Sequence, residues 1–491
     1  MSAFDPKRTC VVPPPTCSTG CASRSSGSHF WPRPHRSLRS GERHKTRQEA
    51  SILRKTLTAL QACALLVGVV VGIGIFKTPQ VVAANVSSDT AFLGLWLIGG
   101  LVTLIGALCY AELGTAYPHV GGEYHFLRKA YGPGLGFLFA WGRMAVMQSG
   151  SIAAVAFVYG DYASFLIPAE PAVHAALAII VLSALQLKGT ELSSRAQLAL
   201  TTATVAVVSF VAVVGWAVVP QSAATSPAPS GGAAGLAMVF ILLTYGGWTE
   251  TVYLSGEVRN PRRDIPRALL FGTAAVTALY LFANYSYLRA LGLEGLRQSS
   301  AIAADLVGLV FGEMGAAVVA GIVCVASLST LNATILTGAR SMYALGRSFA
   351  PFAVLGKHSA GGRSPRNAII VQAAITIGLV VFGAFARDGF QSMVEYTAPV
   401  FWTFLLLVGI SLFVFRWRDP ARAIPFRVPL YPLTPLLFCA TSFYLLYSSL
   451  AYTGLGALIG VAILLAGIPI FLLGRRATSS PRARRVGAQG Q

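Results

Sequence analysis

The chain has 491 residues, of which 54% are hydrophobic and only 11% are charged, and its formal net charge at pH 7 is +20. Soluble domains carry roughly 25% charged residues, and the mean hydropathy here is +0.63. Composition therefore excludes an ordinary soluble protein. Because the Lys and Arg residues lie in short connections between apolar runs, it favours a membrane protein over a nucleic-acid-binding one.

The two ends of the chain differ from the rest. Residues 1–55 are rich in Pro, Ser and Arg without apolar periodicity, so we expect a disordered basic tail with no secretory signal. A start codon assigned too far upstream is the alternative interpretation, although the next Met is Met144. Residues 475–491 form a second basic tail.

Twelve apolar runs lie between the tails, and a membrane-spanning helix needs about 20 apolar residues. We expect surface helices at residues 123–131 and 299–311. The runs cover residues 56–86, 91–117, 134–166, 171–188, 195–219, 234–256, 266–292, 314–346, 366–386, 391–415, 428–450 and 453–474.

The distribution of Lys and Arg predicts the orientation. Of the 38 Lys and Arg residues, 33 lie before the first run, after the last run, or in the connections that follow even-numbered runs. The odd-numbered connections contain only Arg289, Arg297 and Arg387. By the positive-inside rule, both termini are predicted to be cytoplasmic, as an even number of spans requires.

The first run contains the sequence GVVVGIGIF, from Gly68 to Phe76. Gly72, Gly74 and the β-branched residues around them are poor helix formers. A break here would leave free N–H groups at a helix start, which can bind a carboxylate. Alternatively, the glycines only let a neighbouring helix pack closely.

The sixth run has a similar interruption, LLTYGGWTE, with Gly246 and Gly247 at its centre. The first and sixth runs occupy corresponding positions in two five-run halves, which are inverted because five is odd. Paired interrupted helices of this kind indicate the central site of a transporter, so we favour two breaks over close packing.

Six stretches resemble the amino acid–polyamine–organocation (APC) superfamily, and within it the L-type amino acid transporters and their bacterial relatives. They are GIGIFKTP (72–79), CYAELGTAYPHVGGEYHFLRKAYG (109–132), TYGGW (244–248), EVRNPRRDIPRAL (257–269), LNATILTGAR (331–340) and PFRVPLYPLTPLLF (425–438). The resemblance runs from Leu57 to Gly474. It implies an all-α LeuT-type fold in a transporter domain, residues 56–474. Its 12 transmembrane helices would form inverted repeats at 56–219 and 234–415 and two further helices at 428–474.

The resemblance also implies a secondary transporter of amino acids, most simply neutral ones, acting by alternating access as a permease or antiporter. The N–H groups of Ile73, Gly74 and Ile75 would bind the substrate carboxylate, and carbonyl groups at both breaks the ammonium. Runs three, eight and ten would line the side-chain pocket, although Met147 and Trp402 could equally be packing residues. The expected substrate-binding residues are Val69, Val70, Gly72, Ile73, Gly74, Ile75, Met147, Leu243, Thr244, Tyr245, Gly246 and Trp402.

The chain departs from the family pattern at three points. Leu243 replaces a frequent aromatic gate residue, and Thr204 aligns with a Lys that fills a sodium position in many relatives. The loop of residues 167–174 lacks the Cys that joins animal members to a heavy subunit, so we expect no disulfide-linked partner. Sodium bound near Gly68, a proton carried by Glu112, and ion-independent transport all remain open; we favour sodium independence. The expected coupling or gating residues are Glu112, Thr204, Glu257, Ser327 and Thr330.

Charged residues inside the runs are costly in lipid. We expect Glu112 to pair with a cation or hold a gate, and Arg143 to bind backbone carbonyls, substrate or a gate. Asp161 and Glu250 are expected to be solvated near helix ends. Glu257 could form a cytoplasmic ion-pair gate or simply accompany the basic cluster that sets topology.

Other classes of function find less support. A channel or receptor is not favoured, since no TVGYG-type filter occurs. The sequence shows no HExxH or GxxxxGK[ST] motif, so we expect no enzyme, no cofactor and no ATP-driven pump. Cys10, Cys17 and Cys21 lack a fourth ligand at zinc spacing, so no metal site is expected. The alternative substrate is a cationic amino acid or polyamine; the expected partners are the substrate, the bilayer and a coupling proton or sodium ion.

Overall fold

The computed structural model describes residues 58–119, 121–188, 194–218, 233–250, 258, 260–349, 352–356, 365–386, 388–420, 422, 424–452 and 454–479. The N-terminal tail, residues 480–491 of the C-terminal tail and Glu257 lie outside these ranges, so the predictions made for them are not tested by the structure. The regular elements in the described part are helices, as the apolar runs predict.

Every predicted apolar run contains at least one helix. In chain order the elements are α2 (Ala59–Val70), η1 (Ile73–Phe76), α3 (Thr78–Ala84), α4 (Asp89–Ala116), α5 (Gly122–Tyr131), α6 (Pro133–Gly142), η2 (Arg143–Gln148), α7 (Ser149–Leu166), α8 (Pro171–Leu187), α9 (Ser194–Ala217), α10 (Ala234–Thr244), α11 (Pro261–Gln298), α12 (Ile302–Ser348), α13 (Arg366–Ala384), α14 (Gly389–Arg418), α15 (Leu433–Ala451) and α16 (Leu455–Ser479).

Eight helices in the described part are long and apolar enough to cross a membrane, or up to nine if the pair α6–α7 and α8, bent by 117°, is counted as one span. The short α2 and α10 fall below that length because each ends at an interruption of its run. The predicted total of twelve spans and the inverted repeat are therefore not decided by helix length.

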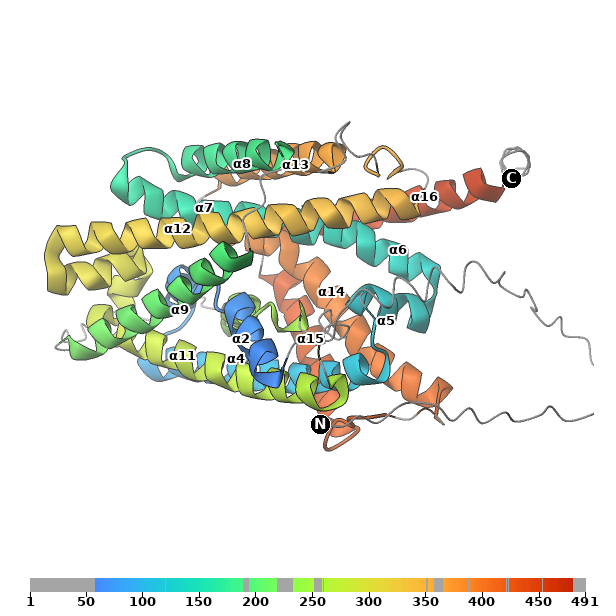
Figure 1. The fold of residues 1–491 in the computed structure, drawn as a ribbon. Helices are drawn as coiled ribbons and strands as arrows, with labels where there is room; N and C mark the ends of the chain where they lie inside the picture. Colours follow the sequence, from blue (N-terminus) through green and yellow to red (C-terminus); the bar gives the residue numbers. More distant parts are fainter. Residues whose placement is uncertain are drawn as a thin grey trace, which may run out of the picture. The chain divides into compact units, whose positions relative to one another are not determined.

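Helices distant in sequence pack around the two interrupted runs. Helix α11 packs against α4, α2 and α9, and α12 packs against α7 and α9. Helix α14 packs against α7, α15 and α16, and α8 lies beside α13 (Figure 1). Many large apolar side chains remain exposed on the outside of this bundle, among them Phe271 and Trp417. Such a surface suits lipid rather than water.

The two predicted surface helices are confirmed as helices. Helix α5 covers Gly122–Tyr131, and the first turns of α12 cover the second predicted segment. Within α12 the backbone turns at Gly312, and within α11 it turns at Gly292, with φ angles of +65° and +67°. Residues with a side chain rarely adopt such angles, so glycine permits both bends.

Candidate functional site

The first interruption follows α2. Val71 has φ −72° and ψ 76°, the geometry of an inverse γ-turn, and Gly72 N–H donates to Val70 O at 2.7 Å. The chain is helical again in η1, and the N–H groups of Ile73 and Gly74 lie at the start of this short helix. N–H groups at a helix start have no partner within it. The predicted break near Ile73 is confirmed.

The second interruption follows α10. This helix ends at Thr244, and Gly246 N–H donates to Leu243 O at 3.0 Å. Gly247 has φ +99°, a conformation that glycine tolerates and most residues do not. The helical path therefore ends near Gly246, as predicted.

The two breaks are in direct contact. Thr78 Oγ1 and Thr244 Oγ1 are hydrogen-bonded at 2.6 Å. A Cβ atom built on Gly74 would lie 3.2 Å from Thr244 Cγ2 and Oγ1, and one on Gly247 would lie 3.1 Å from Val69 Cγ1 and O. Glycine at these positions allows the two backbones to approach, which explains why both interruptions contain it.

Tyr280 of α11 links the carbonyl groups of the two breaks. Its hydroxyl lies 2.9 Å from Val70 O and 3.4 Å from Thr244 O. Its ring packs against Trp96 and Tyr245, and all three side chains are buried. Sequence reasoning missed this residue; the available signal was a Tyr in the middle of an apolar run, where its hydroxyl needs a partner.

The predicted side-chain pocket residues lie in different environments. Met147 is partly buried in η2, a π-helical turn, and Leu243 is partly buried at the end of α10. Trp402 of α14 is buried and lines a small pocket together with Trp248 and Phe438. Its indole N–H has no hydrogen-bonding partner among the described residues.

Two of the hydroxyl groups proposed to replace the missing Lys are bonded within their own helices. Thr204 Oγ1 donates to Leu200 O and Thr330 Oγ1 to Ala326 O, each within its own helix. Thr201, one turn before Thr204, is the residue whose methyl group would meet a Cβ at Gly68. Ser327 is fully buried, and its hydroxyl has no partner within the described part.

Glu112 is paired with a cation, as predicted. Its two carboxylate oxygens accept from Arg416 at 2.8 and 2.7 Å, and Val428 N–H donates to one of them at 2.7 Å. The Arg416 guanidinium also lies 3.8 Å from the centre of the Tyr431 ring. The carboxylate therefore joins the end of α4, the end of α14 and the segment that follows α14.

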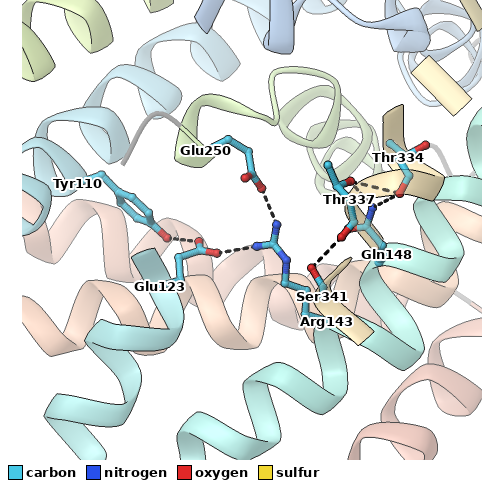
Figure 2. Close-up of polar contacts among 8 residues, drawn as sticks. All are labelled: Tyr110, Glu123, Arg143, Gln148, Glu250, Thr334, Thr337 and Ser341. Carbon is cyan, nitrogen blue, oxygen red and sulfur yellow. Dashed lines mark hydrogen bonds and ion pairs between the residues drawn. The ribbon is translucent and has the colours of Figure 1, made fainter. Parts of the chain in front are cut away.

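Arg143 carries a network of four residues that we call the arginine network: Tyr110, Glu123, Arg143 and Glu250 (Figure 2). Arg143 Nη2 lies 2.7 Å from Glu250 and Nη1 lies 3.4 Å from Glu123. The Tyr110 hydroxyl donates to Glu123 at 2.6 Å. The fork of a guanidinium suits two carboxylates at once. Glu250 is 43% exposed, in agreement with the expected solvated carboxylate, and it also forms an ion pair that was not predicted.

Beside this network, Gln148 of η2 bonds to α12. Its amide donates to Thr334 O at 2.9 Å and lies 3.4 Å from Thr337 Oγ1 (Figure 2). The π-helical turn thus presents a charged and an amide side chain, Arg143 and Gln148, to different neighbouring elements.

Three charged residues form a second cluster, which we call the lysine triad: Lys77, Asp161 and Asp388. Lys77 Nζ lies 2.9 Å from Asp161 Oδ2 and 3.1 Å from Asp388 Oδ2, and the three side chains are 4%, 14% and 26% exposed. The solvated carboxylate expected at Asp161 is therefore wrong. Because the three residues are far apart in sequence, only the packing of α3, α7 and α14 reveals the cluster.

The lysine triad and the arginine network lie at opposite ends of one helical path. Arg143 begins η2 and Asp161 lies near the end of α7. At 1.5 Å per residue, the distance between them along the helix is about 27 Å, close to the roughly 30 Å of a bilayer's hydrocarbon core. The site between the breaks is thus flanked by one charge cluster towards each end.

Comparison with known proteins agrees with this geometry. The profile of the amino acid permease family matches residues 57–473. The chain is 30% identical over 411 residues to the b(0,+)-type amino acid transporter 1 of Homo sapiens, covering 80% of this chain and 82% of the relative. It is 28% identical to the large neutral amino acids transporter small subunit 2 of Homo sapiens (86% and 81% covered). It is also 28% identical to the serine/threonine exchanger SteT of Bacillus subtilis (85% and 96% covered). The chain is an integral membrane protein of the amino acid permease family, and its similarity is to the L-type amino acid transporters within the APC superfamily.

Proposed function

We propose that the chain is a secondary transporter that moves amino acids across the cell membrane by alternating access. The observation that carries the proposal is the direct contact of two interrupted helices at Gly74, Thr78 and Thr244. The names of the relatives, which include amino acid transporters and an exchanger, support the same function. The proposal includes a LeuT-type fold with twelve spans and both termini in the cytoplasm.

The substrate would bind as a zwitterion between the breaks. The N–H groups that open η1 are suited to the carboxylate, since a helix start favours an anion. Val70 O and Thr244 O face the single Tyr280 hydroxyl, so both carbonyl groups already point at a hydrogen-bond donor. An ammonium is also a donor and would be accepted by the same carbonyl groups.

A neutral amino acid suits the charges near the site best. Three of the described carboxylates in the neighbouring runs are engaged by cations, namely Glu112 by Arg416, Glu250 by Arg143 and Asp161 by Lys77, and Glu395 accepts from the amide of Gln391. A cationic side chain would have to displace one of these partners at an energetic cost. The pocket near Trp402 is lined mainly by aromatic and aliphatic side chains.

Sodium-independent exchange or uptake is the coupling we propose. The names of the relatives include an exchanger, and Thr204 and Thr330 donate their hydroxyl hydrogens to carbonyl groups of their own helices. The carboxylate oxygens of Glu112 are already engaged by Arg416 and by Val428 N–H. No disulfide-linked heavy subunit is proposed.

Counterflow of a labelled amino acid panel into liposomes containing the purified protein tests the proposal. We expect exchange of neutral amino acids, unchanged when choline replaces sodium. Gly74→Val should abolish it, because the added side chain meets Thr244; Gly94→Val, where a Cβ meets open space, is the matched control. Folded protein that exchanges none of the amino acids would refute the proposal.

A further inference from the structure

The lysine triad contains two carboxylates and one ammonium. Lys77 precedes α3, Asp161 lies on α7 and Asp388 precedes α14, so one side chain joins three separate helices. The mouth that these helices surround can open only if Lys77 leaves at least one carboxylate. The triad is thus a closing contact for the end of the bundle at which α3 and α7 finish.

The two carboxylates differ in how they are stabilised. Asp388 Oδ1 accepts from Gln391 N–H at 2.9 Å and so caps the start of α14, where a negative charge is favourable. Asp161 has Lys77 as its only side-chain partner among the described residues. Asp388 is also the more exposed of the two.

One ammonium balances only one of these charges. When the mouth is open, water solvates both carboxylates; when it closes, the second negative charge is dehydrated, which is costly unless it is neutralised. Among the residues that the structure describes, no cation other than Lys77 is paired with Asp161 or Asp388. Glu395, which is bonded to Gln391, adds a negative charge on α14, and Asp305 of α12 faces Tyr162 beside Asp161.

We propose that the lysine triad closes the outer mouth of the transporter and that Asp161 takes up a proton from the external medium when it does so. The inference rests on the proposed function and on the orientation in which α3 and α7 end outside. The proton binds a carboxylate oxygen of Asp161 on closing and returns to the same side on opening. External protons therefore regulate the mouth without being carried across.

The test uses a cysteine that is hidden only when the mouth is closed. Val158, one turn before Asp161 on α7, is fully buried. In intact cells expressing Val158→Cys, a membrane-impermeant maleimide reports opening, with the unsubstituted chain as background. The rate is divided by that of Glu170→Cys, at an exposed position after α7, which cancels the effect of pH on thiol reactivity.

We expect this ratio to fall by up to about tenfold for each unit by which external pH is lowered, over the range in which Asp161 titrates, the limit for one linked proton. Asp161→Asn should give a low ratio that no longer changes with pH, and Lys77→Met a high one. Glu395→Gln, a neighbouring carboxylate outside the triad, is the matched control and should retain the pH dependence. If Val158→Cys is inactive, Ala154→Cys, one turn earlier on α7, replaces it.

A pH-independent ratio in the parent, or unchanged pH dependence in Asp161→Asn, would overturn the inference. Amino acid counterflow by the parent separates this failure from a failure of the proposed function, because the parent would still exchange amino acids. Lowering internal pH, or collapsing the gradient with an ionophore at fixed external pH, should leave the ratio unchanged. A change would mean that the proton crosses the membrane, which also contradicts the proposal.

Discussion

The lysine triad and the arginine network lie at opposite ends of one helical path and differ in their chemistry. The triad places one compact ammonium between two carboxylates, and no member is more than 26% exposed. In the arginine network a guanidinium bridges Glu123, 7% exposed, and Glu250, 43% exposed. Both clusters thus place one cation between two carboxylates, but the triad is buried from water, whereas the arginine network reaches water through Glu250. We expect the triad to be sensitive to pH, and the stabilisation by the arginine network to be sensitive to the salt concentration.

The largest expected effect comes from Lys77→Met, which leaves two buried carboxylates without a cation. Removing one partner of a buried ion pair costs about 3–5 kcal/mol. We expect a large fall in melting temperature in detergent and loss of exchange. The triple variant Lys77→Met/Asp161→Asn/Asp388→Asn removes all three charges and should recover most of the stability; if it is as unstable as the single variant, burial of charge is not the cause.

Arg143→Met should cost less, about 2 kcal/mol, because Tyr110 still donates to Glu123 and water still reaches Glu250. The measurement is again thermal unfolding, at low and at high salt. High salt should narrow the gap between the parent and this variant, and should not do so for Lys77→Met. If salt changed the loss of stability in Arg143→Met and in Lys77→Met by the same amount, the contrast between the two clusters would be contradicted. Arg143→Lys, which keeps the charge but not the fork, is the control.

Tyr280→Phe tests the region between the two clusters. It removes the donor shared by Val70 O and Thr244 O and should cost about 1 kcal/mol. We expect weaker amino acid binding, measured by scintillation proximity, with both charge clusters intact. Tyr287→Phe is the matched control, since that hydroxyl is buried on the same helix without a partner in the described part. Equal loss in both variants would assign the effect to packing alone.

The smallest effect concerns His125 on α5, the helix that carries Glu123. Its ring stacks on His119 at 4.1 Å, and burial together with nearby cations lowers the pKa of His125 to about 4. The unfolded chain therefore binds this proton first, so the contribution to stability is complete above pH 6.5 and is lost as pH falls towards 4. His125→Gln should reduce the drop in melting temperature between pH 7 and 4.5. If the drop in melting temperature is unchanged in this variant, His125 is not its cause.

Local sequence was sufficient to predict the helical runs and both breaks. Gly72, Gly74 and Gly246 interrupt apolar runs, and the low helix propensity of glycine acts within a few residues. The lysine triad could not be predicted in the same way, because its members lie at positions 77, 161 and 388 and meet only through packing. Each was visible separately as a charge near the end of an apolar run.

Register along a helix was a second limit. The sequence alignment singled out Thr204, whereas Thr201 is the residue that meets Gly68, one turn away on α9. A shift of one turn keeps the same helix face, so periodicity does not distinguish the two. The pairing of Glu112 was predicted only in part. An isolated carboxylate in an apolar run requires a cation, but only the fold shows that this cation is Arg416.

The contacts of Glu112 supply a reference frame for measuring motion. Arg416 and Val428 N–H tie α4, α14 and the following segment into one block, so we expect spin labels on the ends of α4 and α14 to keep their separation during turnover. Labels on α2 and α4 should change theirs, because α2 ends at the Val71 turn and can tilt as a unit. Distances between spin labels in this protein are therefore best measured relative to a label on α4, which serves as the fixed reference.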